Sequence, residues 1–119
     1  MNRWKGDIMQ PFTQKVISII KLIPAGKVMS YGQIASLAGS PRGARQVVRI
    51  LHSMSKKYQL PWHRVINSKG EIGLRDSDSF ERQRFLLESE GIEFLGEKVV
   101  DLEKFSYVPS LDISTEELF

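Results

Sequence analysis

Cysteine is absent from the 119 residues of this chain. Without thiols, the chain can form no disulfide bond, no thiolate metal site and no cysteine nucleophile. The two histidines, His52 and His63, have no spacing with carboxylates that is typical of a zinc site. No apolar run approaches the ~18 residues that a membrane span needs, and MNRWKGDIMQ has no apolar segment typical of a secretory signal. We therefore expect a cytoplasmic protein with no metal, no cofactor and no membrane association.

Acidic residues are scarce over most of the chain and concentrated at its end. Residues 1–87 hold 15 Lys and Arg against 5 Asp and Glu, whereas residues 88–119 hold 2 against 9. Between Arg42 and Gly70 there are seven basic residues and no acidic one. Such a block suits a polyanion such as nucleic acid, although a solvated basic face would have the same composition.

Three helices are predicted in the first half of the chain, at about Phe12–Leu22, Ser30–Ala38 and Arg42–Ser53. A capping box of Ser30 and Gln33 opens the second helix, and Gly39 ends it. Ser40-Pro41 is expected to supply the N-cap and the first-turn proline of the third helix.

The third helix is predicted to have two different faces. Its apolar residues are expected to point inward and its arginines outward. The apolar set is Val47, Val48, Ile50 and Leu51, and the arginines are Arg42, Arg45 and Arg49. Two helices joined by a tight Gly-Ser-Pro turn predict a helix-turn-helix whose second helix carries the arginines. The same arrangement occurs in many proteins that never touch DNA.

The second half of the chain predicts a hairpin and a further helix. Trp62–Ile66 is expected to be extended, Asn67–Gly70 to be a turn and Glu71–Leu74 to be a returning strand. This hairpin would form a wing beside the helix-turn-helix. Asp78 is expected to cap a last helix that Gly91 ends.

One domain is expected over residues 1–119, with a core from about residue 9 to residue 105. Short extended pieces are expected at Ile92–Phe94 and Val99–Leu102. Residues 1–10 and the acidic tail after Pro109 are expected to pack loosely.

The segment Pro61-Trp62-His63-Arg64-Val65-Ile66 resembles the Pro-Cys-His-Arg-Val motif of the O6-alkylguanine-DNA alkyltransferases. Upstream, IPAGKVMSYGQIASLAG and SPRGARQVV are similar to the helix-turn-helix of the same family. The resemblance covers roughly residues 9–95 and implies an α+β fold, the small winged-helix-like domain at the C-terminus of those enzymes. Tryptophan at the cysteine position is typical of the alkyltransferase-like proteins, which recognise such lesions and pass them to nucleotide excision repair.

The missing thiol excludes the enzymes' chemistry. Alkyl transfer needs a nucleophile that attacks the O6-alkyl carbon, and thiolate is the side-chain group suited to this attack. The indole nitrogen of Trp62 is a donor without useful basicity. The chain is therefore expected to have no catalytic residue and to bind the lesion without removing the alkyl group.

Recognition of an alkylated guanine inside a duplex requires the base to be extruded. The resemblance implies that Arg45 fills the vacated stack and that Tyr31 rotates the phosphate 3′ of the target. Arg42 and Arg49, on the exposed basic face of the third helix, are also expected to bind DNA. A guanidinium can stack on neighbouring bases and hydrogen-bond the orphaned cytosine. From the residues alone, Arg45 could equally be a phosphate contact and Tyr31 a core aromatic.

The resemblance also implies a lesion pocket, made by Trp62, Arg75, His63, Arg64 and Tyr31. Arg75 would place a cation over the alkylated guanine, unless it is a loop arginine in solvent. His63 and Arg64 match a hydrogen-bonded relay of the enzymes and are expected to serve as structural residues here.

Two further positions complete this prediction. Glu90 is expected to pair with the arginine or the histidine of the relay. Where the enzymes usually have a bracing asparagine, this chain has Met54, so either the hydroxyls of Ser53 and Ser55 take that role or the loop is organised differently.

The expected partners are double-stranded DNA containing O6-alkylguanine and, from the resemblance, nucleotide excision repair proteins. The chain is expected to be a monomer, because no long apolar dimerisation helix is visible. The main alternative is a winged-helix transcription regulator that binds undamaged DNA, although such a regulator has no reason to carry Pro61-Trp62-His63-Arg64. A residual hydrolase is disfavoured because no paired carboxylates or metal ligands are present.

Overall fold

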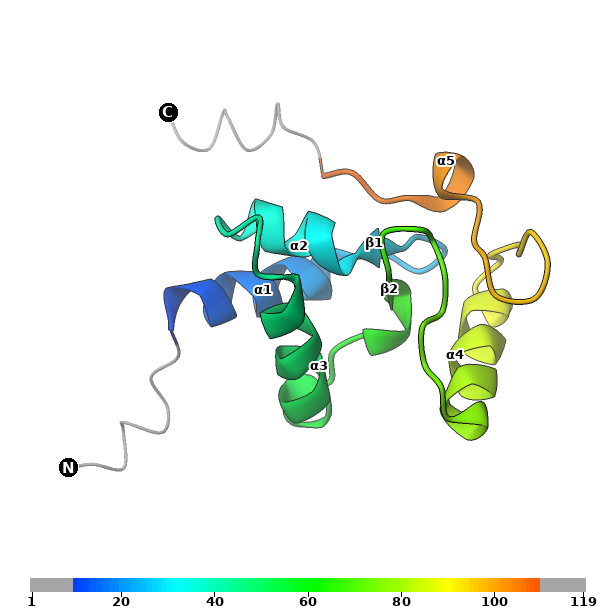
Figure 1. The fold of residues 1–119 in the computed structure, drawn as a ribbon, viewed down its shortest axis with the longest axis horizontal. Helices are drawn as coiled ribbons and strands as arrows, with labels where there is room; N and C mark the ends of the chain where they lie inside the picture. Colours follow the sequence, from blue (N-terminus) through cyan, green and yellow to red (C-terminus); the bar gives the residue numbers. More distant parts are fainter. Residues whose placement is uncertain (1–9, 110–119) are drawn as a thin grey trace.

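The computed structural model describes residues 10–109, so residues 1–9 and 110–119, which make up nearly all of the ends expected to pack loosely, lie outside this range. The elements follow the order α1 (Pro11–Leu22), β1 (Met29–Ser30), α2 (Tyr31–Leu37), α3 (Ala44–Tyr58), the 3-10 turn η2 (Trp62–Arg64), β2 (Val65–Ile66), α4 (Ser77–Ser89) and α5 (Leu102–Phe105). In Figure 1, α1, α2 and α3 form one half, α4 forms the other, and the strands lie between them. No helix within the described range is long and apolar enough to cross a membrane.

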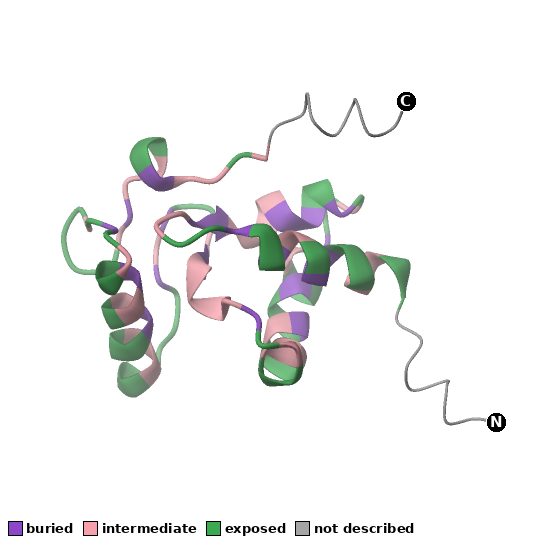
Figure 2. Cartoon of the chain, turned by 180° about the vertical axis from the view of Figure 1, so that it is seen from behind, coloured by how far each residue is buried: buried purple, intermediate pink, exposed green. Residues whose placement is uncertain are grey.

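The two short strands lie between two hydrophobic cores and contribute side chains to both. β1 and β2 run parallel, with Met29 opposite Val65 and Ser30 opposite Ile66. Met29 and Val65 pack into the core between α1, α2 and α3, whereas Ile66 packs into the core beside α4. Successive side chains of a strand point to opposite faces, so this two-residue ladder joins both cores. Figure 2 shows the buried faces of the helices turned toward this centre.

The first two helices confirm their predicted positions. Pro11 starts α1, where a missing N–H costs nothing. The Ser30 hydroxyl accepts a hydrogen bond of 3.1 Å from the Gln33 amide and caps α2. Gly39 follows α2 with a φ of +97°, a conformation that favours glycine.

The predicted start and end of the third helix are wrong. Its N-cap is Gly43, because Gly43 donates to the Ser40 carbonyl and closes a tight turn before the helix begins. A Cβ at Gly43 would lie 2.9 Å from Phe12 Cζ, so glycine allows this turn to approach α1. The helix also continues beyond Ser53 to Tyr58, and ends where Gln59 adopts a left-handed conformation with a φ of 52°.

The predicted hairpin is also wrong. Trp62–Arg64 forms a 3-10 turn, and only Val65–Ile66 is a strand, paired in parallel with β1. The turn at Asn67–Gly70 is present, since the Gly70 amide donates to the Asn67 carbonyl. The chain after this turn pairs with a later segment, as Glu71 forms an antiparallel bridge with Val99.

The last part of the chain ties both halves together. Asp76 caps α4 in place of the predicted Asp78, since its carboxylate accepts a 2.9 Å hydrogen bond from the Ser79 amide. The predicted extended pieces meet at an antiparallel bridge between Phe94 and Val100, although Leu102 already belongs to α5. Beyond α5, the chain forms a parallel bridge with Val28 and so packs against the first half.

Candidate functional site

Trp62 lies in a turn that leads directly from the end of α3. Its amide donates a 2.8 Å hydrogen bond to the Leu60 carbonyl, and the Arg64 amide donates one of 3.0 Å to the Pro61 carbonyl. These bonds wind residues 62–64 into η2 before the chain extends into β2. The indole meets the His63 ring edge-on, with ring centroids 6.0 Å apart.

A cavity of about 310 Å³ opens beside Trp62, and we call it the inner cavity. Its walls come from α2, α3, the Trp62 turn and α4. They consist of Tyr31, Val48, Leu51, His52, Ser55, Trp62, Val65, Leu74, Ser79 and Gln83. This size and this mixture of apolar walls with a few polar groups suit a planar organic ligand such as a nucleobase.

Tyr31 and Val48 also line the inner cavity. Tyr31 is the first residue of α2, and burial raises the pKa of its phenol, so the hydroxyl stays a neutral donor. Val48 was predicted to face the core, and this prediction is wrong. Val47 and Ile50 occupy the core face of α3, which turns Val48 to the cavity with 44% of its surface exposed.

Gln83 is a cavity residue that the sequence prediction missed. The residue is only 3% exposed, and its amide nitrogen donates to the backbone carbonyls of His63 and Val65, both at 3.0 Å. It therefore fixes the Trp62 turn to α4. A signal was available, because Phe80, Gln83 and Leu87 share the i, i+3, i+7 spacing of a buried helical face.

Behind the turn, His63 and Arg64 meet at Glu90, which follows α4. His63 Nε2 donates to Glu90 Oε2 at 2.8 Å, and Arg64 donates to the same carboxylate through Nη2 at 2.7 Å and Nε at 3.0 Å. Arg64 Nη1 also donates to the Ile23 carbonyl at 2.8 Å, and Glu90 Oε1 accepts from the Gly26 amide. The predicted pairing of Glu90 is confirmed, and so is the expectation that His63 and Arg64 serve as structural residues.

This network holds Glu90 in its charged form. Burial would raise the pKa of the carboxyl, but hydrogen bonds from Arg64, His63 and the Gly26 amide outweigh that effect and lower the pKa to about 2. Both donors are therefore committed to a carboxylate behind the turn. His63 and Arg64 do not line the inner cavity, and their contact with a lesion stays a prediction.

Arg75 and Met54 differ from their expected surroundings. Arg75 is exposed and does not line the inner cavity, although its neighbour Leu74 does, so its role over a bound base also stays a prediction. Met54 packs against the core of α1, α2 and α3. The hydroxyls of Ser53 and Ser55 donate to carbonyls of α3 itself, so the idea that they brace the turn is wrong.

The three arginines of the helix-turn-helix are exposed as predicted, but Arg42 lies outside the third helix to which it was assigned. Helices α2 and α3 pack against each other. Arg42 lies in the turn between them, and Arg45 and Arg49 lie one helical turn apart on α3. All three side chains are exposed. This face can offer guanidinium groups to phosphates, while the inner cavity opens on the neighbouring side of α3.

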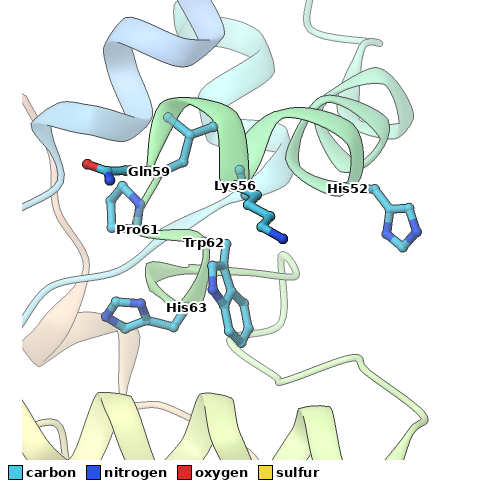
Figure 3. A pocket seen from close by; sticks show the side chains of 8 residues that line it. His52, Lys56, Gln59, Pro61, Trp62 and His63 are labelled. Carbon is cyan, nitrogen blue, oxygen red and sulfur yellow. The ribbon is translucent and has the colours of Figure 1, made fainter.

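A second, wider hollow of about 750 Å³ adjoins the inner cavity, and we call it the annex (Figure 3). The two spaces share His52, Ser55 and Trp62. The remaining walls of the annex are Lys56, Gln59, Leu60, Pro61 and His63. Within residues 10–109, no group of three or more histidine and carboxylate side chains could hold a metal ion.

Comparisons with known proteins find relatives of similar sequence. The family described as 6-O-methylguanine DNA methyltransferase, DNA binding domain, matches residues 11–92. The DNA base-flipping protein of Escherichia coli is 44% identical over 96 residues, which cover 81% of this chain and 74% of that protein. Alkyltransferase-like protein 1 of Schizosaccharomyces pombe is 42% identical over 106 residues, which cover 85% of this chain and 98% of that protein.

The fold is similar to a solved complex as well. The crystal structure of S. pombe Atl1 in complex with damaged DNA containing O6-carboxymethylguanine aligns with a TM-score of 0.75 at 41% identity, covering 86% of this chain and 99% of that one. The predicted α+β, winged-helix-like class is thereby confirmed, although the hairpin expected as its wing is not formed.

Proposed function

The chain belongs to the 6-O-methylguanine DNA methyltransferase DNA-binding-domain family, and from this membership we propose that it binds O6-alkylguanine in duplex DNA by flipping the damaged nucleotide. The observation that carries the proposal is the inner cavity, which lies beside an exposed, arginine-bearing helix and is walled by Trp62 at the family's cysteine position. A flipped base enters such a cavity edge-first, with its O6 substituent toward the indole.

Binding leaves the alkyl group on the DNA. The chain contains no cysteine, and the indole of Trp62 cannot accept an alkyl group from O6 under neutral conditions. The relatives that match 81–85% of the chain are named base-flipping protein and alkyltransferase-like protein, in agreement with a binder that is not an enzyme.

Base flipping costs a few kcal/mol of stacking and pairing, which the protein must offset by contacts made only in the flipped state. Arg45 enters the vacated stack from the exposed face of α3, and Arg42 and Arg49 hold the phosphates. Tyr31 stands at the N-terminus of α2, where its ring rotates the phosphate on the 3′ side of the target. These assignments are supported by the exposure of the arginines and by the position of Tyr31 at the cavity.

Arg75 acts after the base has entered. It follows Leu74, which lies on the cavity wall, so a rotation of its side chain brings the guanidinium across the mouth of the cavity. A cation over an alkylated guanine contributes about 0.5–2 kcal/mol. His63, Arg64 and Glu90 act from behind, since they hold the turn that carries Trp62.

We further propose that the protein acts as a monomer in the cytoplasm and that the bound, distorted DNA is handed to nucleotide excision repair proteins. The acidic stretch after residue 88 is separate in sequence from the basic DNA-binding block, which leaves it available to protein partners.

Titration of a duplex with one O6-methylguanine against its unmodified twin, at matched salt, tests the proposal. We expect tighter binding of the damaged duplex, and a mass spectrum of the recovered protein should show no added methyl group. Equal affinities would favour a transcription regulator, and stoichiometric methylation of the protein would refute the assignment as a binder.

A further inference from the structure

A flipped guanine that occupies the inner cavity does not fill the annex. It adjoins the inner cavity at Trp62, the residue that an O6 substituent faces in the proposed complex. In that complex, an O6-methyl group reaches no farther than the indole of Trp62. A longer substituent has to turn past the indole, and the annex is the space that it enters there.

The described walls of the annex carry a positive charge and no negative charge. Among the described residues, Lys56 is the only Lys or Arg on its walls, and no Asp or Glu lines it. Figure 3 shows the Lys56 side chain extending from α3 toward Trp62, while His52 points away. Lys56 forms no ion pair within residues 10–109, so its ammonium group is free to meet a ligand.

The carboxylate that pairs with the annex residue His63 does not neutralise this charge. His63 links the annex wall to Glu90, but that carboxylate already accepts hydrogen bonds from His63, Arg64 and the Gly26 amide. A negatively charged group in the annex therefore meets Lys56 and the Trp62 ring, and none of the described residues on the annex walls is a carboxylate that would repel it.

We propose that the annex binds the anionic end of an extended O6 substituent, such as a carboxylate, with Lys56 as its counter-charge. The inference rests on the proposed function, since it requires the damaged base to occupy the inner cavity. It extends that function from alkyl groups in general to a preference for adducts that carry a negative charge.

A substituent that differs in charge but little in length isolates this contribution. We would measure the affinity of the full-length protein for three otherwise identical duplexes that contain O6-carboxymethylguanine, O6-propylguanine or guanine. The variant Lys56→Gln removes the charge from the annex. The matched control is Lys57→Gln, because Lys57 lies over the Tyr58 ring at 5.4 Å and lines neither space.

Lys56→Gln should lower the ratio of carboxymethyl to propyl affinity by about two- to fivefold, the range for one partly exposed ion pair. Lys57→Gln should leave that ratio unchanged, and raised salt should reduce it for the parent protein. Using a ratio removes the general loss of DNA affinity that follows from deleting any positive charge.

Three results would overturn the inference, and each points to a different cause. If Lys56→Gln weakens all three duplexes by one common factor, Lys56 contacts a DNA phosphate rather than the adduct. If both variants lower the ratio equally, the preference for the carboxymethyl group arises from the long-range positive charge of the protein and not from a contact in the annex. If neither damaged duplex binds more tightly than guanine in the parent protein, the proposed function fails together with the inference.

Discussion

The substitution Glu90→Gln tests the network that holds the Trp62 turn. Glutamine keeps the shape of the side chain and one acceptor oxygen, but it removes the charge that His63 and Arg64 share. The pKa of Glu90 is lowered from an ordinary 4.5 to about 2, which corresponds to about 3 kcal/mol of unfolding free energy at neutral pH. The side chain is 16% exposed, so solvent screening reduces this to about 2–3 kcal/mol.

The pH dependence of this loss follows from the direction of the pKa shift. Because the pKa of Glu90 is lower in the folded protein, the carboxylate stabilises the fold fully above about pH 4.5. The stabilisation disappears as the pH falls toward about 2, where the folded protein also takes up the proton. The parent protein and Glu90→Gln should therefore differ most near neutral pH and converge in acid.

Urea unfolding at several pH values measures this difference. The control is Glu88→Gln in the last turn of α4, because Glu88 is half exposed and pairs with Arg84 at i, i+4. Such a pair contributes about 0.3–0.5 kcal/mol. A loss for Glu90→Gln no larger than that of the control, or a loss that is the same at neutral and acidic pH, would refute the role of the Glu90 charge.

Three further outcomes are expected from DNA-binding measurements. Arg45→Ala should weaken damaged and undamaged duplex alike, whereas Arg75→Ala should reduce only the preference for alkylated guanine, by about 0.5–2 kcal/mol; equal effects of both substitutions would make Arg75 a phosphate contact. The log–log slope of nonspecific affinity against salt should be roughly −4 to −5, for about four to six phosphates neutralised, and a flat response would mean that the Arg42–Lys69 block does not face DNA. Gln83→Met, which keeps the bulk and removes both hydrogen bonds to the Trp62 turn, should lower lesion preference more than nonspecific affinity, and titration of paired duplexes shows whether it does.

Local signals in the sequence predicted the parts of the fold that local chemistry determines. The capping of α2 by Ser30 needs only a hydroxyl three residues before an amide, and it was predictable from that spacing. The end of α3 was not, because Gln59 has no sequence property that marks it for a left-handed conformation. Similarly, Asp76 and Asp78 are both suitable caps, and only the path of the preceding loop decides between them.

Contacts between distant segments were harder to predict. The extended pattern of Val65–Ile66 suggested a hairpin with the next segment, but its partner is Met29–Ser30, and nothing in local alternation specifies a parallel partner across two helices. For the candidate site, the resemblance placed Tyr31 and Trp62 in one pocket, and both residues line the inner cavity. Gln83 was missed because a glutamine on a charged helix has no distinctive pattern unless its neighbours on the buried face are considered.

The parallel pairing of β1 and β2 has a consequence for the order of folding. It closes a loop that contains the whole helix-turn-helix, so its formation has a larger entropic cost than the packing of α2 on α3, which are neighbours in the chain. We therefore expect the helix-turn-helix to form before the ladder. Tyr31 directly follows β1 and Trp62 closely precedes β2, so the two walls of the inner cavity meet only when the ladder closes. A nascent chain would thus gain affinity for the DNA backbone before it can distinguish a damaged base from a normal one.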